Sequence, residues 1–400
     1  MGKIDLSHMI GLPPASAVEY LTEKGHTFSW DWHETMQEAN AKAFTVAKAM
    51  RMDVLSDIRE MVQKAFAEGI TLEQFKKELT PRLQAKGWWG KQTVGTEDAQ
   101  SPQTVQLGSP YRLKTIYRTN MQTAYMAGRW KGMKDAAEDR PHWEYVAVMD
   151  KRTRPGHASL NGKVFSHDDP FWDGFYPPNG WGCRCRVRAL SDGKLTARGL
   201  SVSSSDGRLS EKDALVSKAT GEMRPVAVYK DALTGKTVSP DVGWSYNPGK
   251  AAWQPDLDAY PYDVARKYVE GAVTGPAFTR FFSGKDQGIF PVAVLRPDDK
   301  ALLGSESQVV KLSSETVKDH IEKHPEITVE DYRKLPQIID EGEVYRQGED
   351  RLIYLQTEGF LYRTTVKRTN NGKESYATTL FKTTDKKADR GVRKKYERIR

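Results

Sequence analysis

Apolar and polar residues in the N-terminal half of the chain recur with the period of an α-helix. Between residues 29 and 86, apolar side chains return at steps of three and four positions, which predicts two amphipathic helices followed by a shorter third one. Gly69 is expected to end the second helix, Thr71 to cap the third, and Pro81 to stop it. The same period over residues 111–135 predicts a further helix.

Turn-forming and β-branched residues interrupt this helical pattern. Residues 87–110 are rich in turn formers and have no period, which predicts a long loop, whereas residues 143–150 (WEYVAVMD) have the composition of a strand. Residues 197–220 are rich in Ser, Gly, Asp and Lys, and this composition predicts a poorly ordered connection at a domain boundary. Residues 225–275 mix Pro, Gly and aromatic residues irregularly, which indicates an extended segment lying on a partner surface.

From Phe290 onward the pattern changes to short alternating strands with turn residues between them. Two helices are expected at residues 314–324 and 328–340. The expected strands are residues 290–296, 308–313, 343–347, 351–357, 359–368 and 374–382. This end of the chain is therefore predicted to be an α+β domain with a meandering sheet.

The length of 400 residues favours two or three domains over one. We predict a multidomain α+β protein with four parts. A helical N-terminal domain carries a small β-rich Cys-x-Cys subdomain, an extended linker follows, and the C-terminal α+β domain has two helices and a meandering antiparallel sheet. The expected divisions are an arm at 1–28, the helical domain at 29–195, the linker at 196–285 and the last domain at 286–400.

Charge and hydropathy limit the partners and the compartment. The chain has 61 Lys and Arg against 53 Asp and Glu, a net charge of +8, and residues 382–400 alone carry nine basic and three acidic residues. A polyanion such as nucleic acid is a compatible partner. A solvated charged helix would equally explain the basic residues at this end of the chain. The N-terminus lacks a signal-peptide core and no run approaches a membrane span, so we expect synthesis in the cytoplasm and no membrane partner.

Residues 150–188 collect side chains that can bind a metal such as zinc. The candidate ligands are Asp150, His157, His167, Cys183 and Cys185. The segment has many Gly and Pro and little apolar material over its first thirty residues, so a metal would help to hold one conformation. The spacing is Cys-x-Cys and not Cys-x-x-Cys, which leaves a second interpretation open: two buried thiols and histidines that form ordinary hydrogen bonds.

Three motifs in this half resemble the signature of the phage head morphogenesis family typified by the minor head protein of phage Mu. They are YRTNMQTAYMAGR, DKRTRPGHASLNGKVF and PPNGWGCRCRV, in the order and spacing of the family, and the resemblance covers roughly residues 30–190. The resemblance implies a non-enzymatic protein inside the head near the portal, acting in assembly or DNA packaging. The matching positions are Arg118, Thr119, Asp150, Thr153, Arg154, His157, Gly162, Pro178, Cys183 and Cys185.

Residues 290–400 resemble the phage nuclease group related to barnase, EndoU, colicin toxins and RelE. The resemblance rests on FPVAVLRPDDKALLGSESQVVKLSSETVKDHIEKHPEITVEDY and the strands after it. It implies metal-independent RNA cleavage, in which a base takes the 2′-hydroxyl proton and the oxygen attacks the adjacent phosphate. Such chemistry needs an acid and a base that titrate near neutrality, and cations for the phosphate.

Six residues are candidates for that chemistry. His320 and His324 lie four positions apart on one predicted helix, hence on one face, and can supply the acid and the base. The candidates on the predicted strands are Arg363, Lys367, Thr378 and Thr379. The alternative is that His324 only closes its helix and that the basic residues form a solvated strand face.

Three functional hypotheses follow. The first is a minor capsid protein at the portal–capsid junction with an appended ribonuclease module, synthesised in the host cytoplasm and located inside the virion head. Its expected partners are the portal protein, the major capsid or scaffold protein, packaged DNA and an RNA substrate. The alternatives are a phage-delivered ribonuclease toxin and a non-enzymatic head adaptor whose basic tail binds DNA.

Overall fold

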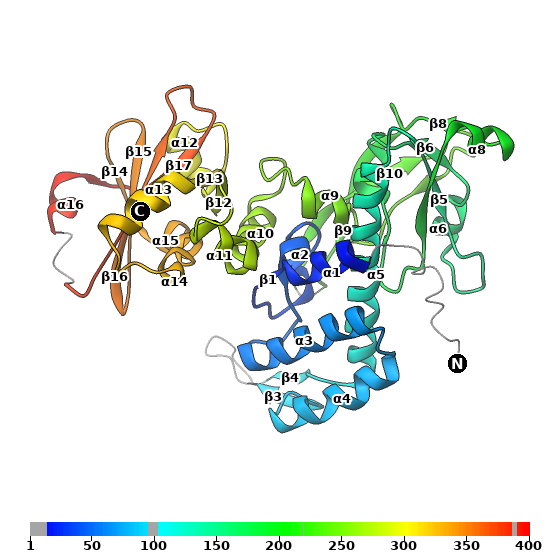
Figure 1. Ribbon diagram of the computed structural model, residues 1–400, viewed down its shortest axis with the longest axis horizontal. Helices are drawn as coiled ribbons and strands as arrows, with labels where there is room; N and C mark the ends of the chain where they lie inside the picture. Colours follow the sequence, from blue (N-terminus) through cyan, green and yellow to red (C-terminus); the bar gives the residue numbers. More distant parts are fainter. Residues whose placement is uncertain (1–13, 95–102, 219, 386–389) are drawn as a thin grey trace. The chain divides into compact units, whose positions relative to one another are not determined.

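The computed structural model describes residues 14–94, 103–218, 220–385 and 390–400 (Figure 1). It confirms a multidomain α+β protein with several separate sheets. The chain divides into two compact units. The first contains Met1–Thr22, Phe28–Ala41 and Thr45–Pro255, and the second contains Glu23–Thr27, Lys42–Phe44 and Asp256–Arg400.

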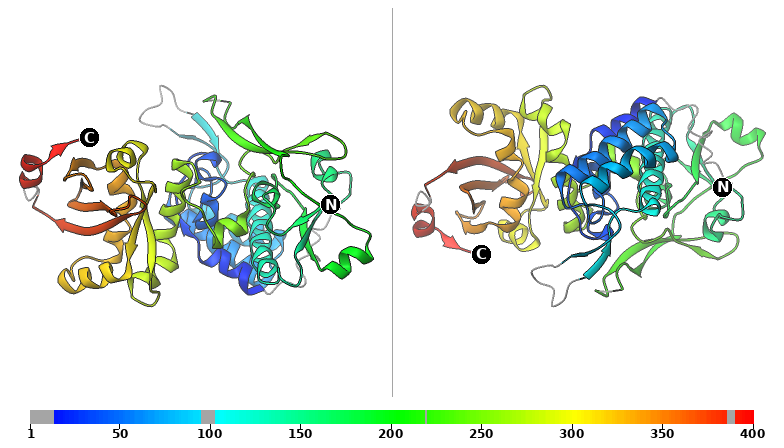
Figure 2. Two further views of the ribbon diagram at one scale, coloured as in Figure 1. Left: turned by 90° about the horizontal axis from the view of Figure 1, so that it is seen from above. Right: turned by 90° about the horizontal axis from the view of Figure 1, so that it is seen from below.

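Helices dominate the first part of the first unit. Its helical elements are α1 (Pro14–Thr22), η2 (Trp32–Thr35), α3 (Met52–Glu68), α4 (Leu72–Ala85) and the long α5 (Pro110–Asp135). Helices α1, α3 and α4 pack against α5 (Figures 1 and 2). Gly69 ends α3 with a φ of 69°, and the Thr71 side chain accepts the Gln74 N–H at the start of α4, as the sequence predicts.

Three expectations for this region were wrong. Apolar residues 44–50 do not form the first of the expected helices, because the chain there passes from α2 (Ala39–Lys42) through the short strand β2 (Ala43–Phe44) into turns. Helix α4 continues through Pro81, since buried residues on both sides of the proline outweigh one lost hydrogen bond. The expected loop at 87–110 contains a hairpin of β3 (Lys91–Val94) and β4 (Gln103–Gln106).

The second part of the first unit is β-rich and shares its core with α5. A four-stranded sheet has the order β7-β5-β6-β8, and a three-stranded antiparallel sheet has the order β11-β10-β9. The strands are β5 (His142–Val146), β6 (Val164–Ser166), β7 (Arg186–Leu190), β8 (Val202–Ser203), β9 (Leu209–Leu215), β10 (Met223–Lys230) and β11 (Thr237–Val238). Short helices lie between and after them: α6 (Pro155–Ser159), α7 (Phe171–Phe175), α8 (Asp192–Ala197) and α9 (Pro248–Trp253).

An aromatic cluster forms the core of this β-rich part. Trp143 of β5, Phe165 of β6 and Phe171 of α7 are each fully buried, and they pack with Tyr125 and Trp130 of α5. Phe165 and Phe171 stack with ring centroids 4.1 Å apart. Large apolar side chains therefore hold the Cys-x-Cys subdomain against the long helix.

The second unit is built on one seven-stranded sheet of order β12-β13-β17-β16-β15-β14-β18. Its strands are β12 (Ile289–Val294), β13 (Val309–Ser313), β14 (Glu343–Arg346), β15 (Arg351–Glu358), β16 (Phe360–Arg368), β17 (Ser375–Thr383) and β18 (Glu397–Arg398). The predicted meander is present from β14 to β17, but β13 pairs with β17 in parallel, so the sheet is not purely antiparallel.

Helices of the second unit pack on this sheet. They are α10 (Tyr262–Thr274), α11 (Pro276–Phe282), α12 (Pro297–Leu303), α13 (Ser314–Lys323), α14 (Val329–Tyr332), α15 (Leu335–Glu341) and α16 (Arg390–Lys395). The predicted helix 314–324 is α13, whereas the predicted helix 328–340 is divided into α14 and α15. Helices α10 and α15 pack on β12, and α13 packs on β13 and β17 (Figure 1).

Residues 196–285 are more regular than the extended linker that we expected. They contain β8 to β11 and helices α9 to α11, and the division between the two units falls after Pro255. Helix α10 belongs to the second unit, where Gly271 allows Ala43 of β2 to approach its backbone; a Cβ at Gly271 would lie 2.7 Å from Ala43. The domain boundaries predicted from the sequence after residues 28, 195 and 285 stay predictions.

Candidate functional sites

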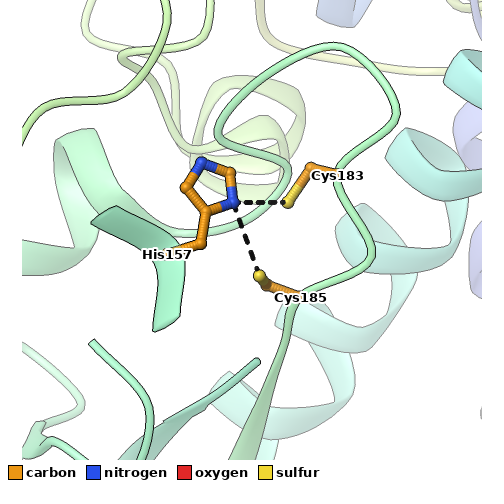
Figure 3. Close-up of side chains that lie close together, drawn as sticks. All are labelled: His157, Cys183 and Cys185. Carbon is orange, nitrogen blue, oxygen red and sulfur yellow. Dashed lines mark hydrogen bonds between the residues drawn. The ribbon is translucent and has the colours of Figure 1, made fainter. Parts of the chain in front are cut away.

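Three of the five expected metal ligands converge in the first unit. His157 lies in α6, Cys183 follows a turn, and Cys185 directly precedes β7. The Nδ1 atom of His157 is 3.7 Å from the Cys183 Sγ and 3.6 Å from the Cys185 Sγ (Figure 3). All three residues are buried, and their ligand atoms lie within 4.8 Å of one another. The cluster can hold a metal ion.

The local sequence explains why both thiols face the same way. Gly182 adopts a φ of 69° in the turn before Cys183, a conformation that glycine tolerates. Residues 183–185 then enter β7, and in an extended chain alternate side chains point to the same side. The intervening Arg184 accordingly points away, and its guanidinium donates to both carboxylate oxygens of Asp150, at 2.7 and 2.5 Å.

Neighbouring polar groups stabilise negative charge on one of the two sulfurs, that of Cys183. Hydrogen bonding from Cys185, and then from His157, lowers the pKa of Cys183 well below its ordinary value although burial opposes the shift. The same Cys183–Cys185 contact, followed by burial, raises the pKa of Cys185. One sulfur of the pair therefore ionises more readily than an isolated buried thiol.

Asp150 and His167, the other two expected ligands, are not members of the cluster. Hydrogen bonding with Arg184 lowers the pKa of the Asp150 carboxyl, which is committed to that arginine. The Nδ1 atom of His167 lies 3.2 Å from the Lys134 Nζ, and its ring packs beside Trp143. Tyr145 and Asn179, which were not predicted from the sequence, lie beside the two sulfurs instead. The Tyr145 hydroxyl donates to the Asn179 Oδ1 at 2.9 Å.

A second candidate site is a cleft of about 610 Å³ in the second unit. It gathers five of the six residues proposed for phosphodiester chemistry, from α13, β16 and β17. These are His320, His324, Arg363, Thr378 and Thr379. Lys367 instead lines a neighbouring pocket of about 430 Å³, together with Arg368 and Asn371. The cleft is also lined by four residues that were not predicted from the sequence: Asp319, Lys323, Gln347 and Tyr396.

The two histidines of the cleft have different surroundings. The Nδ1 atom of His320 is 2.9 Å from the Tyr332 hydroxyl, and burial, followed by the charge of His324, lowers the pKa of His320. His324 directly follows α13, has a side chain that is 42% exposed, and has its Nδ1 atom 3.2 Å from the Glu326 carboxylate. Their ring centroids are 4.9 Å apart. His320 is thus held in place, whereas His324 is accessible.

Cationic and hydroxyl groups complete the walls of this cleft. The Arg363 guanidinium lies 4.8 Å from the centroid of the Phe381 ring, which orients it by a cation–π contact. The Thr378 hydroxyl donates to the Thr365 carbonyl at 3.2 Å, and the Gln347 side chain donates to the Tyr396 hydroxyl at 2.9 Å. A bound anion would therefore meet a cation that is already positioned.

One family-model match lies within the first unit. Residues 56–188, which include all three cluster residues, match the family model described as Phage Mu protein F like protein. The chain is 50% identical over 255 residues to "Putative capsid assembly protein F" of Escherichia phage Mu, covering 63% of this chain and 58% of that protein. It is 45% identical over 231 residues to the Mu-like prophage FluMu F protein of Haemophilus influenzae, covering 57% of this chain and 55% of that protein.

The matched segments thus span a little over half the length of these relatives. They support the resemblance to the Mu-type head morphogenesis family over the matched region. No solved structure matches the chain. Among the described residues, no helix is long and apolar enough to cross a membrane. The nuclease resemblance of residues 290–400 stays a prediction.

Proposed function

We propose that this protein acts in the assembly of a tailed-phage head, as a minor component at the portal–capsid junction. The observation that carries the proposal is the 50% identity over 255 residues to a phage Mu protein whose name is that of a capsid assembly protein. The portal protein, the major capsid or scaffold protein and the packaged DNA are its proposed partners. Zinc at the His157–Cys183–Cys185 cluster would have a structural role in this function.

Localisation in particles tests this proposal directly. Precursor heads and infectious particles of the parental phage are purified and analysed by mass spectrometry, with and without the coding sequence of the chain. We expect a few copies per particle, and empty or aberrant heads when the coding sequence is removed. Normal, DNA-filled heads without the protein, together with its absence from precursor heads, would overturn the proposal.

The cleft of the second unit favours a second function, the cleavage of RNA. Five residues chosen from the sequence for this chemistry line one cleft. In the reaction, a base takes the 2′-hydroxyl proton, the 2′-oxygen bonds to phosphorus, and the bond to the 5′-oxygen breaks as that oxygen takes a proton from an acid. The accessible His324, near Glu326, is the better placed of the two histidines to exchange protons, and Arg363 would stabilise the charged phosphate.

Cleavage of total tRNA by the purified full chain tests this second function. We expect products ending in a 2′,3′-cyclic phosphate, unaffected by a metal chelator, and a loss of at least about 100-fold in rate for His324→Ala and Arg363→Ala. His167→Ala, in the first unit, is the matched control and should retain the full rate. An equal rate in all four proteins would assign the activity to a contaminant and remove the nuclease function.

A further inference from the structure

The geometry of the His157–Cys183–Cys185 cluster points to one bound zinc ion. We propose that the ion is ligated by the His157 Nδ1 and the two cysteine Sγ atoms, with a water molecule at the fourth position of a tetrahedron. The three protein ligands come from α6 and from the turn that leads into β7. The inference does not depend on the role in head assembly.

The interatomic distances carry the proposal. With Zn–S bonds of about 2.3 Å and Zn–N bonds of about 2.05 Å, a tetrahedral site places sulfur and nitrogen about 3.6 Å apart. The observed distances are 3.7 Å for Cys183 and 3.6 Å for Cys185. An imidazole nitrogen has one lone pair or one proton, so it can form one good hydrogen bond with one of the sulfurs. A shared metal explains why Nδ1 is almost equally far from both (Figure 3).

The orientation of the imidazole gives a second argument. The Nε2 atom of His157 is buried, and no hydrogen-bond partner for it exists among the described residues. The side of the ring that faces the sulfurs is therefore the side with polar interactions. A metal bound at Nδ1 would leave the proton on Nε2.

Charge and ligand type select the metal. Two thiolates and one neutral imidazole around a divalent cation make a neutral centre, which a buried position tolerates. Sulfur ligands exclude Mg²⁺ and Ca²⁺, which prefer oxygen, and favour zinc. The backbone of Asn179 toward Cys183 provides a hydrogen bond of the kind that thiolate ligands usually receive.

The ion would connect two irregular segments of the first unit. Residues 147–163 consist of turns around α6, and residues 176–185 form the turn before β7. The histidine lies 26 residues before the first cysteine and 28 before the second. Binding of the ion would therefore close both loops onto the aromatic core and reduce their freedom.

Metal analysis of the full chain, purified without a histidine tag, tests the proposal. We expect about one zinc ion per chain, and less than about a tenth of that for His157→Gln and Cys185→Ser. The matched controls are Asp150→Asn and His167→Gln, which change expected ligands that lie outside the cluster, and the double variant His320→Ala/His324→Ala, which removes the histidine pair of the cleft. All three controls should retain one ion.

A titration of the unmodified chain keeps the test valid if a variant fails to fold. The chain contains only two cysteines, so a mercurial reagent that blocks thiols must release the zinc in step with those two groups. Replacement by cobalt should give thiolate-to-metal charge-transfer bands and the intense visible bands of a tetrahedral site. Metal-free protein from zinc-supplemented cells, or zinc that stays bound after both thiols are blocked, would overturn the proposal.

Discussion

Glu38 shows how one side chain can set the pH dependence of stability. The carboxyl group lies in the mostly buried stretch between η2 and α2, and burial raises its pKa from 4.5 to about 7. In the unfolded chain the same group ionises at its ordinary value. Below pH 4.5 both states are protonated and the group has no effect; above pH 7 the folded state bears the full cost of a buried charge.

The substitution Glu38→Gln should therefore stabilise the first unit at high pH. We expect the free energy of unfolding to exceed that of the unmodified protein by about 1–3 kcal/mol at pH 8, and the difference to disappear near pH 4.5. Urea unfolding at several pH values, monitored by tryptophan fluorescence, measures this difference in the free energy of unfolding. A difference that is the same at pH 4.5 and pH 8 would show that Glu38 ionises normally in the folded protein.

Residue types alone predicted part of the His157–Cys183–Cys185 cluster. The alternation in Cys-x-Cys and the ligand chemistry of His157 identified the three residues that converge. Asp150 and His167 were included because each can bind zinc, but their partners Arg184 and Lys134 lie 34 and 33 residues away in sequence. Only the tertiary structure shows which polar groups are already engaged.

At the scale of elements, close contact between helices depends on glycine in α5. A Cβ atom at Gly128 would lie 2.8–3.0 Å from backbone and side-chain atoms of Ala17 in α1. One turn further, Gly132 is exposed, and a Cβ there would meet nothing within 4 Å. The two glycines share a helix and differ in what surrounds them.

Alanine substitutions at these two positions should have opposite effects. Gly128→Ala is expected to destabilise the first unit by about 1–3 kcal/mol, because the backbones of α1 and α5 must separate. Gly132→Ala should stabilise it by up to about 1 kcal/mol through helix propensity alone. Chemical unfolding of both variants measures the effects. Stabilisation by both substitutions would mean that α1 does not pack on α5 through Gly128.

Elements with a clear period were predictable, and elements that depend on distant partners were not. Helix α5 and the strands β14 to β17 agree with the sequence analysis to within one or two residues. The region 225–275 was expected to be extended because its proline and aromatic residues hide the period. Its helix α10 nevertheless buries seven residues and packs on β12. The parallel pairing of β13 with β17 likewise joins strands more than sixty residues apart.

At the scale of the whole molecule, the tryptophans are distributed so that each unit can be observed separately. All ten tryptophans of the chain belong to the first unit. They are Trp30, Trp32, Trp88, Trp89, Trp130, Trp143, Trp172, Trp181, Trp244 and Trp253. Tryptophan fluorescence therefore reports the unfolding of the first unit, whereas far-ultraviolet circular dichroism reports both.

Removal of the proposed zinc should destabilise one unit only. The cluster lies in the first unit, so a chelator is expected to lower the melting temperature seen by tryptophan fluorescence by roughly 5–10 °C. The second unit contains the sheet from β12 to β18 and none of the three ligands, so its transition in circular dichroism should not move. Cys185→Ser should lower the first transition without chelator and abolish any further effect of chelation. If the chelator instead moved only the second transition, the bound metal would lie in the second unit, with the His320–His324 pair as its most direct ligands.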